Sequence, residues 1–205
     1  QKSPAIWCPE CGTALAQADL DDLERETTFY TLAFTLDNGQ TLPIATTRPE
    51  LLPACVAVFV HPEDGRYAHL TGSQVRVPFF GQCVPLLADP VADPEKGPGA
   101  VMCCTFGDTT DIGWWRVFDL PLIEAIAADG TLTGEAGEFA GKKASEARSE
   151  IVRVLEANDL LLGSDPKSQT VRVHERCDTP VEYVVTSQWF IRVLDHKETL
   201  LARGE

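Results

Sequence analysis

Positive charge is scarce in this chain. Its 205 residues include 17 lysines and arginines against 31 aspartates and glutamates, which gives a net charge of −14. That balance excludes a surface that coats nucleic acid non-specifically, so any contact with a polynucleotide must be local or supplied by another part of a longer protein. Long apolar runs are also missing: none approaches the roughly 20 residues of a membrane span, and no secretory signal pattern opens the chain. We therefore expect no membrane partner.

A regular cysteine framework is absent as well. The seven cysteines are odd in number and irregular in spacing, which argues against a disulfide scaffold and predicts a reducing compartment, the cytoplasm. Four of them lie in apolar, strand-like runs, where free cysteine behaves as a small hydrophobic side chain: Cys55, Cys83, Cys103 and Cys104. Metal or redox chemistry is therefore expected at the remaining three.

Those three cysteines form, with one histidine, two short motifs at opposite ends of the chain. Cys8 and Cys11, and then His174 and Cys177, each have the two-residue spacing that lets a pair of side chains bind one zinc ion. Together they predict a tetrahedral site whose four ligands all come from protein, which makes the zinc structural rather than catalytic. The alternative is a redox pair of cysteines and an ordinary strand histidine. Gly12, directly after the first motif, favours the zinc-ribbon interpretation.

Strand-like runs dominate the middle of the chain. Asn38-Gly39 separates two runs rich in strand-forming residues, 29–36 and 41–47, and predicts a hairpin. Further strands are predicted, between proline and glycine turn signals, at 55–60, 75–80, 83–88 and 99–104. Helices are predicted at 109–119 and 142–157, and returning strands of the ribbon at 171–174 and 183–191. Residues 15–25 are predicted to be a loop or a ribbon edge, and residues 134–141 a flexible loop. We predict an α+β fold: a β-barrel core with peripheral helices, plus a small zinc-ribbon-like module formed by both termini.

Polar residues close the second strand of the predicted hairpin. Thr46, Thr47 and Arg48 precede Pro49 and Glu50. Two hydroxyls and a guanidinium at a strand end could hold a phosphate or a ribose and stabilise a developing oxyanion. Composition alone favours a simpler alternative, a strand terminus at which proline stops the strand and Arg48 pairs with Glu50.

Two aspartates, Asp108 and Asp111, follow the predicted strand at 99–104 and stand at the start of the predicted helix. Asp108 can cap that helix, and Asp111 is favoured near its positive end. Asp111 could instead project into a cleft and bind an ammonium group or orient a water. Trp114 and Trp115 are predicted to be core residues or part of a pocket wall.

These segments, in this order, resemble the large insertion of the class I aminoacyl-tRNA synthetases for valine, isoleucine and leucine. The similarity covers nearly the whole chain: the motifs that begin at Trp7 and Ala45, the Gly97–Asp111 segment, and the return from Cys177 to Ile191. The valyl member of the group is the best match, in its archaeal-type version. Three places depart from the motifs of many bacterial members, which carry Pro-Ala-His-Asp in place of Thr105-Phe106-Gly107-Asp108, a threonine in place of Leu51 and a lysine in place of Met102. No role is transferred to Leu51 and Met102.

The resemblance implies an editing domain, connective polypeptide 1, that hydrolyses the ester of mischarged aminoacyl-tRNA. A hydrophobic valine site cannot strongly reject threonine, a near-isostere that adds a hydroxyl, so a second site must remove the product, Thr-tRNA(Val). The implied partners are the mischarged tRNA 3′ end and the rest of the parent synthetase, which binds ATP elsewhere. The hydrolysis itself is expected to need no cofactor.

Motif position implies a role for each polar residue. Asp111 would hold the α-ammonium group, Thr46 and Thr47 would orient the water or stabilise the oxyanion, and Arg48 would hold the sugar or phosphate of the terminal adenosine. Asp108 would help to read the hydroxyl of the substrate. Two alternatives stay open: an isoleucyl editing domain that clears Val-tRNA(Ile), with an all-apolar lining beside Asp111, and a non-catalytic module that binds the tRNA acceptor end.

The same resemblance implies a division of the chain into three parts. Residues 1–27 and 170–192 would form a discontinuous zinc-ribbon-like neck, and residues 28–169 would form the editing domain. Residues 193–205 would begin the return into the parent synthetase. Because Gln1 is not an initiator methionine, we expect the chain to have been excised from a longer protein.

Overall fold

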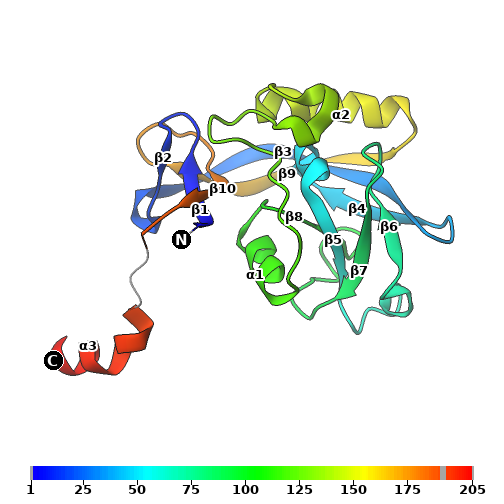
Figure 1. Cartoon of the computed structure of the whole chain (residues 1–205). Helices are drawn as coiled ribbons and strands as arrows, with labels where there is room; N and C mark the ends of the chain where they lie inside the picture. The colour runs from blue at the N-terminus through cyan, green and yellow to red at the C-terminus, as the bar shows by residue number, and fades with distance from the viewer. Residues whose placement is uncertain (1, 190–192, 205) are drawn as a thin grey trace.

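The core of the molecule is a curled seven-stranded sheet. The computed structural model describes residues 2–189 and 193–204. The strands run in the order β4-β3-β6-β7-β5-β8, and β9 pairs with β3 on its other side. Their bounds are β3 (Leu20–Leu36), β4 (Thr41–Thr46), β5 (Cys55–Val60), β6 (Gln74–Arg76), β7 (Cys83–Ala88), β8 (Ala100–Cys104) and β9 (Leu161–His174). The end strands of that order, β4 and β8, lie against each other, so the sheet forms a half-barrel (Figure 1).

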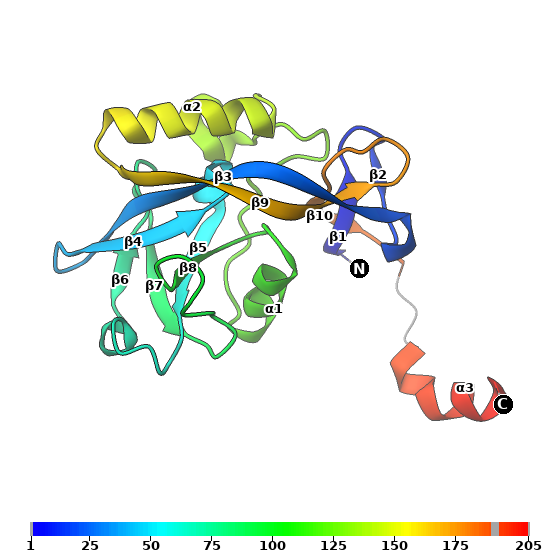
Figure 2. The same ribbon diagram turned by 180° about the vertical axis from the view of Figure 1, so that it is seen from behind.

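Three helices accompany the strands: α1 (Thr109–Val117), α2 (Ala144–Ala157) and α3 (Lys197–Gly204). The short 3-10 turns are η1 (Gln17–Asp19), η2 (Pro49–Ala54), η3 (Ala68–Leu70), η4 (Gly134–Phe139) and η5 (Val193–His196). Helix α2 lies along β3 and β9 (Figures 1 and 2) and buries Ala147, Ile151 and Leu155, which share one helical face. None of the described helices is long and apolar enough to cross a membrane. The predicted α+β class is confirmed, with a half-barrel at its centre.

The hairpin and the central strands follow the sequence pattern closely. Leu36 N donates to Gln40 O at 2.8 Å, and Gly39 takes the positive φ of 84° that the turn requires. Strand β5 is buried along its whole length. Its Val58 packs into the main core, whereas Phe59 packs with Trp114 in a second cluster under α1. Burial on both faces explains its continuous apolar run.

Of the two interpretations of residues 15–25, a loop or a ribbon edge, the ribbon edge is correct from Leu20 onward. Strand β3 begins at Leu20 and pairs in antiparallel register with β9, from Leu20 opposite His174 to Leu32 opposite Leu161. The residues between Leu20 and Glu26 are largely exposed, so no apolar alternation marks this stretch as a strand. Hydrogen bonds to the distant strand β9 hold this stretch in place, and apolar periodicity in the local sequence cannot predict them. The predicted strand at 171–174 is accordingly the end of the much longer β9.

Both ends of the chain meet in a small second sheet, which we call the neck. It contains β1 (Lys2–Cys8), β2 (Thr13–Ala14) and β10 (Glu182–Ser187), in the order β10-β1-β2. The predicted strand at 183–191 therefore ends early, and its last two residues lie outside the described part. The β3–β9 ribbon joins the neck to the half-barrel (Figure 2). Because this ribbon is continuous, the predicted boundaries at 27/28 and 169/170 fall within paired strands.

The segment 134–141, predicted to be a flexible loop, is a folded part of the core. Thr133 Oγ1 accepts a hydrogen bond from Glu135 N, and η4 follows. Ala136 and Phe139 are buried in the main cluster. The glycine and glutamate content of this segment suggested mobility, but two apolar side chains are enough to fix it against the half-barrel.

Candidate functional site

A cavity of about 650 Å³ lies between the half-barrel and the neck. Its walls come from the end of β4, the loop before β8, the start of α1, strand β9 and the residues at the start of β10. The volume is within the range of small-molecule sites. The structure brings all five polar residues singled out from the sequence to this one cavity: Thr46, Thr47, Arg48, Asp108 and Asp111.

Asp111 is a buried carboxyl group in the first turn of α1. It is 7% exposed, and its Oδ2 accepts a hydrogen bond from Gly107 N at 2.8 Å. Burial, aided by the nearby charge of Asp108, raises the pKa of Asp111 to about 7. A cationic group placed in the cavity would favour the ionised form. The arrangement thus supplies a site for a positive charge.

Asp108 caps the same helix, as one of the two interpretations predicted. Its Oδ1 accepts from Thr110 N at 2.7 Å and from Asp111 N at 3.0 Å. The residue is exposed and also lines the cavity. Capping and a place in the cavity are therefore compatible for this carboxylate.

The two tryptophans behave as predicted for core and wall residues. Trp114 is buried, stacks on Phe59 with ring centroids 4.1 Å apart, and lines the cavity. Trp115 packs edge-on against Phe106 at 5.3 Å. These stacked rings fix α1, and with it Asp111, against β5 and β8.

The end of β4 supplies the opposite wall. Thr46 is buried, and its Oγ1 accepts a hydrogen bond from Arg48 N at 3.0 Å. Thr47 is half-buried and lines the cavity. This local turn keeps both threonines and the arginine together where the strand ends.

Arg48 belongs to a buried ion network that sequence analysis found only in part. Its Nε donates to Glu50 at 2.9 Å, which confirms the predicted pair, and its Nη2 lies 2.7 Å from Glu182 of β10. Arg148 of α2 donates to both oxygens of the same carboxylate, from Nη2 to Oε1 at 2.6 Å and from Nε to Oε2 at 2.8 Å. Among the described residues, no acceptor is bonded to Nη1 of Arg48. The guanidinium thus joins the half-barrel to the neck and keeps two N–H groups for a ligand.

Glu50 is the centre of this network and is fully buried. Burial opposes its ionisation, but the hydrogen bonds from Arg148 and the charge of Arg48 keep the pKa of Glu50 below its usual value. No local motif predicted Glu182 or Arg148 as partners, because Glu182 is 134 residues from Arg48 and Arg148 is 98 residues from Glu50 along the chain.

The four predicted metal ligands lie together in the neck, and their ligand atoms are all within 4.8 Å of one another. Sulfur atoms of Cys8 and Cys177 are 3.6 Å apart, those of Cys11 and Cys177 are 3.8 Å apart, and His174 Nδ1 is 3.4 Å from both Cys11 and Cys177. Tetrahedral zinc with bonds of about 2.3 Å to sulfur and about 2.05 Å to nitrogen requires separations of about 3.8 and about 3.6 Å. The donor set therefore fits a metal ion.

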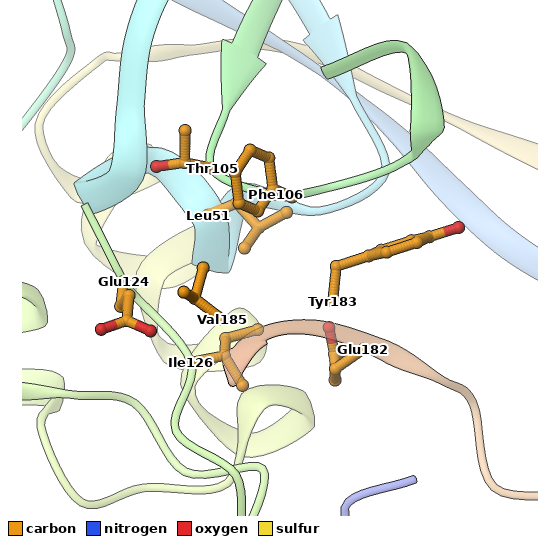
Figure 3. Close-up of a pocket in the computed structure, with 8 residues that line it drawn as sticks. All are labelled: Leu51, Thr105, Phe106, Glu124, Ile126, Glu182, Tyr183 and Val185. Atoms are coloured by element: carbon orange, nitrogen blue, oxygen red, sulfur yellow. The ribbon is translucent and has the colours of Figure 1, made fainter. Parts of the chain in front are cut away.

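A much smaller cavity, of about 10 Å³, lies at the seam between neck and half-barrel (Figure 3). It has room for about one water molecule. Its lining residues are Leu51, Thr105, Phe106, Glu124, Ile126, Glu182, Tyr183 and Val185. In Figure 3 the Tyr183 ring points away from Val185, and this residue also lines the large cavity. The seam is thus closely packed, and ligand chemistry is expected in the large cavity.

Comparison with known proteins gives a consistent relationship. No family model matches the chain. Valine–tRNA ligase of Haloarcula marismortui is 49% identical over 212 residues, covering 100% of this chain and 24% of the relative. Valine–tRNA ligase of Rickettsia rickettsii is 48% identical over 202 residues, covering 98% of this chain and 25% of the relative.

The chain is homologous to a segment of valine–tRNA ligase. It spans about a quarter of the length of the curated relatives it matches. The resemblance to the valyl member of the class I synthetases, found from the motifs, is confirmed. The identity extends over the neck as well as the half-barrel, so both belong to the ligase segment.

A solved structure supports the fold of this ligase segment. The chain superposes with a TM-score of 0.50 and 17% identity on LeuRS of Agrobacterium radiobacter K84, which was crystallised in a ternary complex with tRNA and LeuAMS. The match covers 80% of this chain and 24% of the LeuRS chain. At this identity it shows a shared fold only.

Proposed function

We propose that the chain is the post-transfer editing domain of a valyl-tRNA synthetase and that it hydrolyses the ester of mischarged Thr-tRNA(Val). The observation on which the proposal rests is the cavity in which a buried carboxyl, Asp111, faces the polar end of β4. The homology to valine–tRNA ligase supports it. The partners would be the tRNA 3′ end and the remainder of the parent synthetase, in which ATP binds elsewhere.

The proposed mechanism relies on positioning. Asp111 binds the α-ammonium group of the threonyl moiety, which fixes the ester in the cavity. Thr46 and Thr47 orient the attacking water or stabilise the oxyanion that forms at the carbonyl carbon. Arg48 holds a sugar or phosphate oxygen of the terminal adenosine through Nη1. An ester linked to ribose is already activated, so a water held near 3 Å can react without a strong base or a cofactor.

The cavity lining favours threonine over valine as the amino acid removed. Hydrogen-bonding side chains line the same cavity as Asp111: the carboxylate of Asp108 and the hydroxyl groups of Thr46 and Thr47. An all-apolar lining, which valine would need, is not what the described cavity has. The isoleucyl alternative is also disfavoured by the relatives, which are valine–tRNA ligases.

We further propose that the cluster in the neck holds a structural zinc ion. The three thiols and the imidazole nitrogen are ligands that zinc prefers, and together they would supply all four ligands of a tetrahedral ion. Hydrogen bonds from Thr179 lower the pKa of the Cys177 thiol to about 6, whereas the neighbouring Cys8 and Cys177 raise the pKa of the Cys11 thiol to about 11. Cys177 would therefore be the first of the two to ionise. Such an ion would fasten the two ends of the chain and take no part in hydrolysis.

The function is tested by deacylation of Thr-tRNA(Val), with the chain itself and with the full-length ligase that contains it. Asp111→Ala should lower hydrolysis at least about 100-fold, because the ammonium group loses its only buried carboxylate partner in the proposed complex. Asp37→Ala, in the exposed hairpin turn, is the matched control and should hydrolyse normally. Undiminished hydrolysis by Asp111→Ala would disprove the assignment. Binding of tRNA without hydrolysis by the unchanged chain and ligase would favour the non-catalytic alternative.

A further inference from the structure

Three exposed cations line the large cavity: Lys96, Lys167 and Arg172. Within residues 2–189 and 193–204, none of them forms an ion pair with a carboxylate. Arg48, the fourth cation in the lining, is already paired with two glutamates. In a chain of net charge −14, three cations without an ion-pair partner among the described residues form a local positive rim around one cavity.

Two of these cations are held in place by aromatic neighbours on the ribbon and the neck. Lys167 Nζ lies 4.6 Å from the centroid of the Phe29 ring, a cation–π contact. Arg172 lies near the Tyr183 hydroxyl, and its positive charge partly offsets the effect of burial, which raises the pKa of Tyr183. Both aromatic residues are half-buried and line the cavity. The rim therefore combines positive charge with aromatic faces, the combination that binds single-stranded nucleic acid.

The spacing of the two strand residues indicates an extended ligand. Lys167 and Arg172 are both on β9, and a rise of about 3.3 Å per residue places them about 17 Å apart along the strand. A single phosphate cannot bridge that distance. A chain of linked phosphates can.

The cavity also has a charge polarity. Asp108 and Asp111 stand at the start of α1, whereas Lys167 and Arg172 stand on β9. Asp93 accompanies Lys96 in the loop before β8. Asp22 is opposite Arg172 in the register of the ribbon. Asp93 and Asp22 offset part of the positive charge of Lys96 and Arg172. The contrast between the carboxylates of α1 and the cations of β9 still matches a ligand with an ammonium group at one end and phosphates along its length.

We propose that Lys167 and Arg172 bind the backbone phosphates that precede the terminal nucleoside of the RNA, with Lys96 on the opposite side of the cavity. The ribbon would then guide the single-stranded 3′ end toward Asp111. This inference rests on the proposed function for the identity of the RNA, but it concerns binding and not hydrolysis.

The test measures binding of uncharged tRNA by fluorescence anisotropy at several salt concentrations. Because no ester is present, the result does not depend on whether the chain hydrolyses anything. Lys167→Ala and Arg172→Ala should each reduce the slope of log K against log salt by about 0.7, the value for one lost contact to single-stranded phosphate. If a variant and the unchanged chain bind equally at 1 M salt, this difference in slope makes the variant bind about 8-fold more weakly at about 50 mM salt. Arg172→Lys should restore the slope, since it keeps the charge.

Arg153→Ala is the matched control, because Arg153 is exposed on α2, away from the cavity. It should leave the slope unchanged. Removal of the last three nucleotides of the tRNA should abolish the difference between Lys167→Ala and the unchanged chain. The proposal is overturned if the two cavity variants keep the full slope, if Arg153→Ala loses as much, or if the unchanged chain does not bind tRNA at about 50 mM salt. Thermal melting of each variant confirms that it is folded.

Discussion

At the residue scale, the main feature is Asp111, a carboxyl group whose burial disfavours its ionised form. The sequence placed Asp111 at the start of a helix, but two interpretations were open, helix-end electrostatics and a cleft. The structure shows a buried carboxyl that accepts from Gly107 and lines a cavity. A single sequence could not decide between the two, because the neighbours that bury Asp111 come from other elements.

Asp111→Asn should stabilise the fold more at pH 8 than at pH 5. The native pKa of about 7 lies above the ordinary value of 3.8, so the native state binds more protons between these values and stability falls as pH rises through that window. Asparagine has no such titration and can still accept from Gly107. With about 1.36 kcal/mol per pH unit, the extra stabilisation between pH 5 and pH 8 is at most about 3 kcal/mol. Urea denaturation of both proteins at the two pH values measures the difference in their free energies of unfolding. The same difference at pH 5 and pH 8 would contradict a raised pKa for Asp111.

Gly107→Ala should impair the site from the backbone side. A Cβ at this position would lie 2.8 Å from Asp111 Oδ2 and 3.2 Å from Leu51 Cδ1. Since Asp111 is buried and cannot swing away freely, we expect about 1–3 kcal/mol of destabilisation and at least about 10-fold slower hydrolysis. Deacylation rates and thermal melting check both.

Gly113→Ala is the control for that change. Gly113 is exposed in the same helix, and a Cβ there meets nothing within 4 Å. Alanine should stabilise the helix by up to about 1 kcal/mol and leave hydrolysis unchanged. Equal losses from the two substitutions would show that the effect of Gly107→Ala is a general property of α1.

At the element scale, the sequence predicted strands best where buried apolar residues form a clear pattern. It predicted them worst where only hydrogen bonds to another strand hold the backbone. Strands β5 and β7 are at the predicted positions, because apolar runs bounded by turn residues identify buried strands. The first part of β3 is polar and exposed, and only its ladder with β9 makes it a strand. The ion network of Arg48 likewise joins η2, α2 and β10, and only its Arg48–Glu50 pair lies within one local segment.

Glu50→Gln should destabilise the fold strongly. Glu50 is fully buried between Arg48 and Arg148. The neutral side chain leaves Arg148 without its carboxylate and Arg48 with Glu182 alone, at a cost of about 3–5 kcal/mol. Glu150→Gln is the control, because Glu150 pairs with Lys142 on the surface of α2 and such a pair contributes at most about 1 kcal/mol. Urea denaturation measures both. A small effect of Glu50→Gln, similar to that of the control, would show that the network adds little.

At the scale of the whole molecule, neck and half-barrel are connected by several independent contacts. The β3–β9 ribbon runs from one to the other, Arg48 binds Glu182, and Trp7 Nε1 donates to Ala128 O at 2.7 Å. The predicted metal ligands close the far end of the neck. A metal ion would therefore affect the neck first and the site only through these connections.

Metal removal should loosen the neck and leave the half-barrel folded. We expect about one zinc per chain by elemental analysis, lost in Cys11→Ser and retained in Cys83→Ser, which changes an exposed cysteine outside the cluster. After chelation, hydrogen exchange should show lost protection in β1 and β10 and retained protection in β5 and β8. Unchanged protection of β1 and β10 would exclude a structural metal.

The sequence by itself determined the fold class, the central strands, the two cysteine and histidine motifs and the five polar residues that line the large cavity. These features depend on local periodicity, turn chemistry and ligand spacing, all of which are written within short segments. Tertiary structure alone decided that Asp111 is buried, that Glu182 and Arg148 complete the network, and that Lys167 and Arg172 line the same cavity. Each of these depends on contacts between residues far apart in the chain, where burial and charge are set by neighbours that the local sequence does not specify.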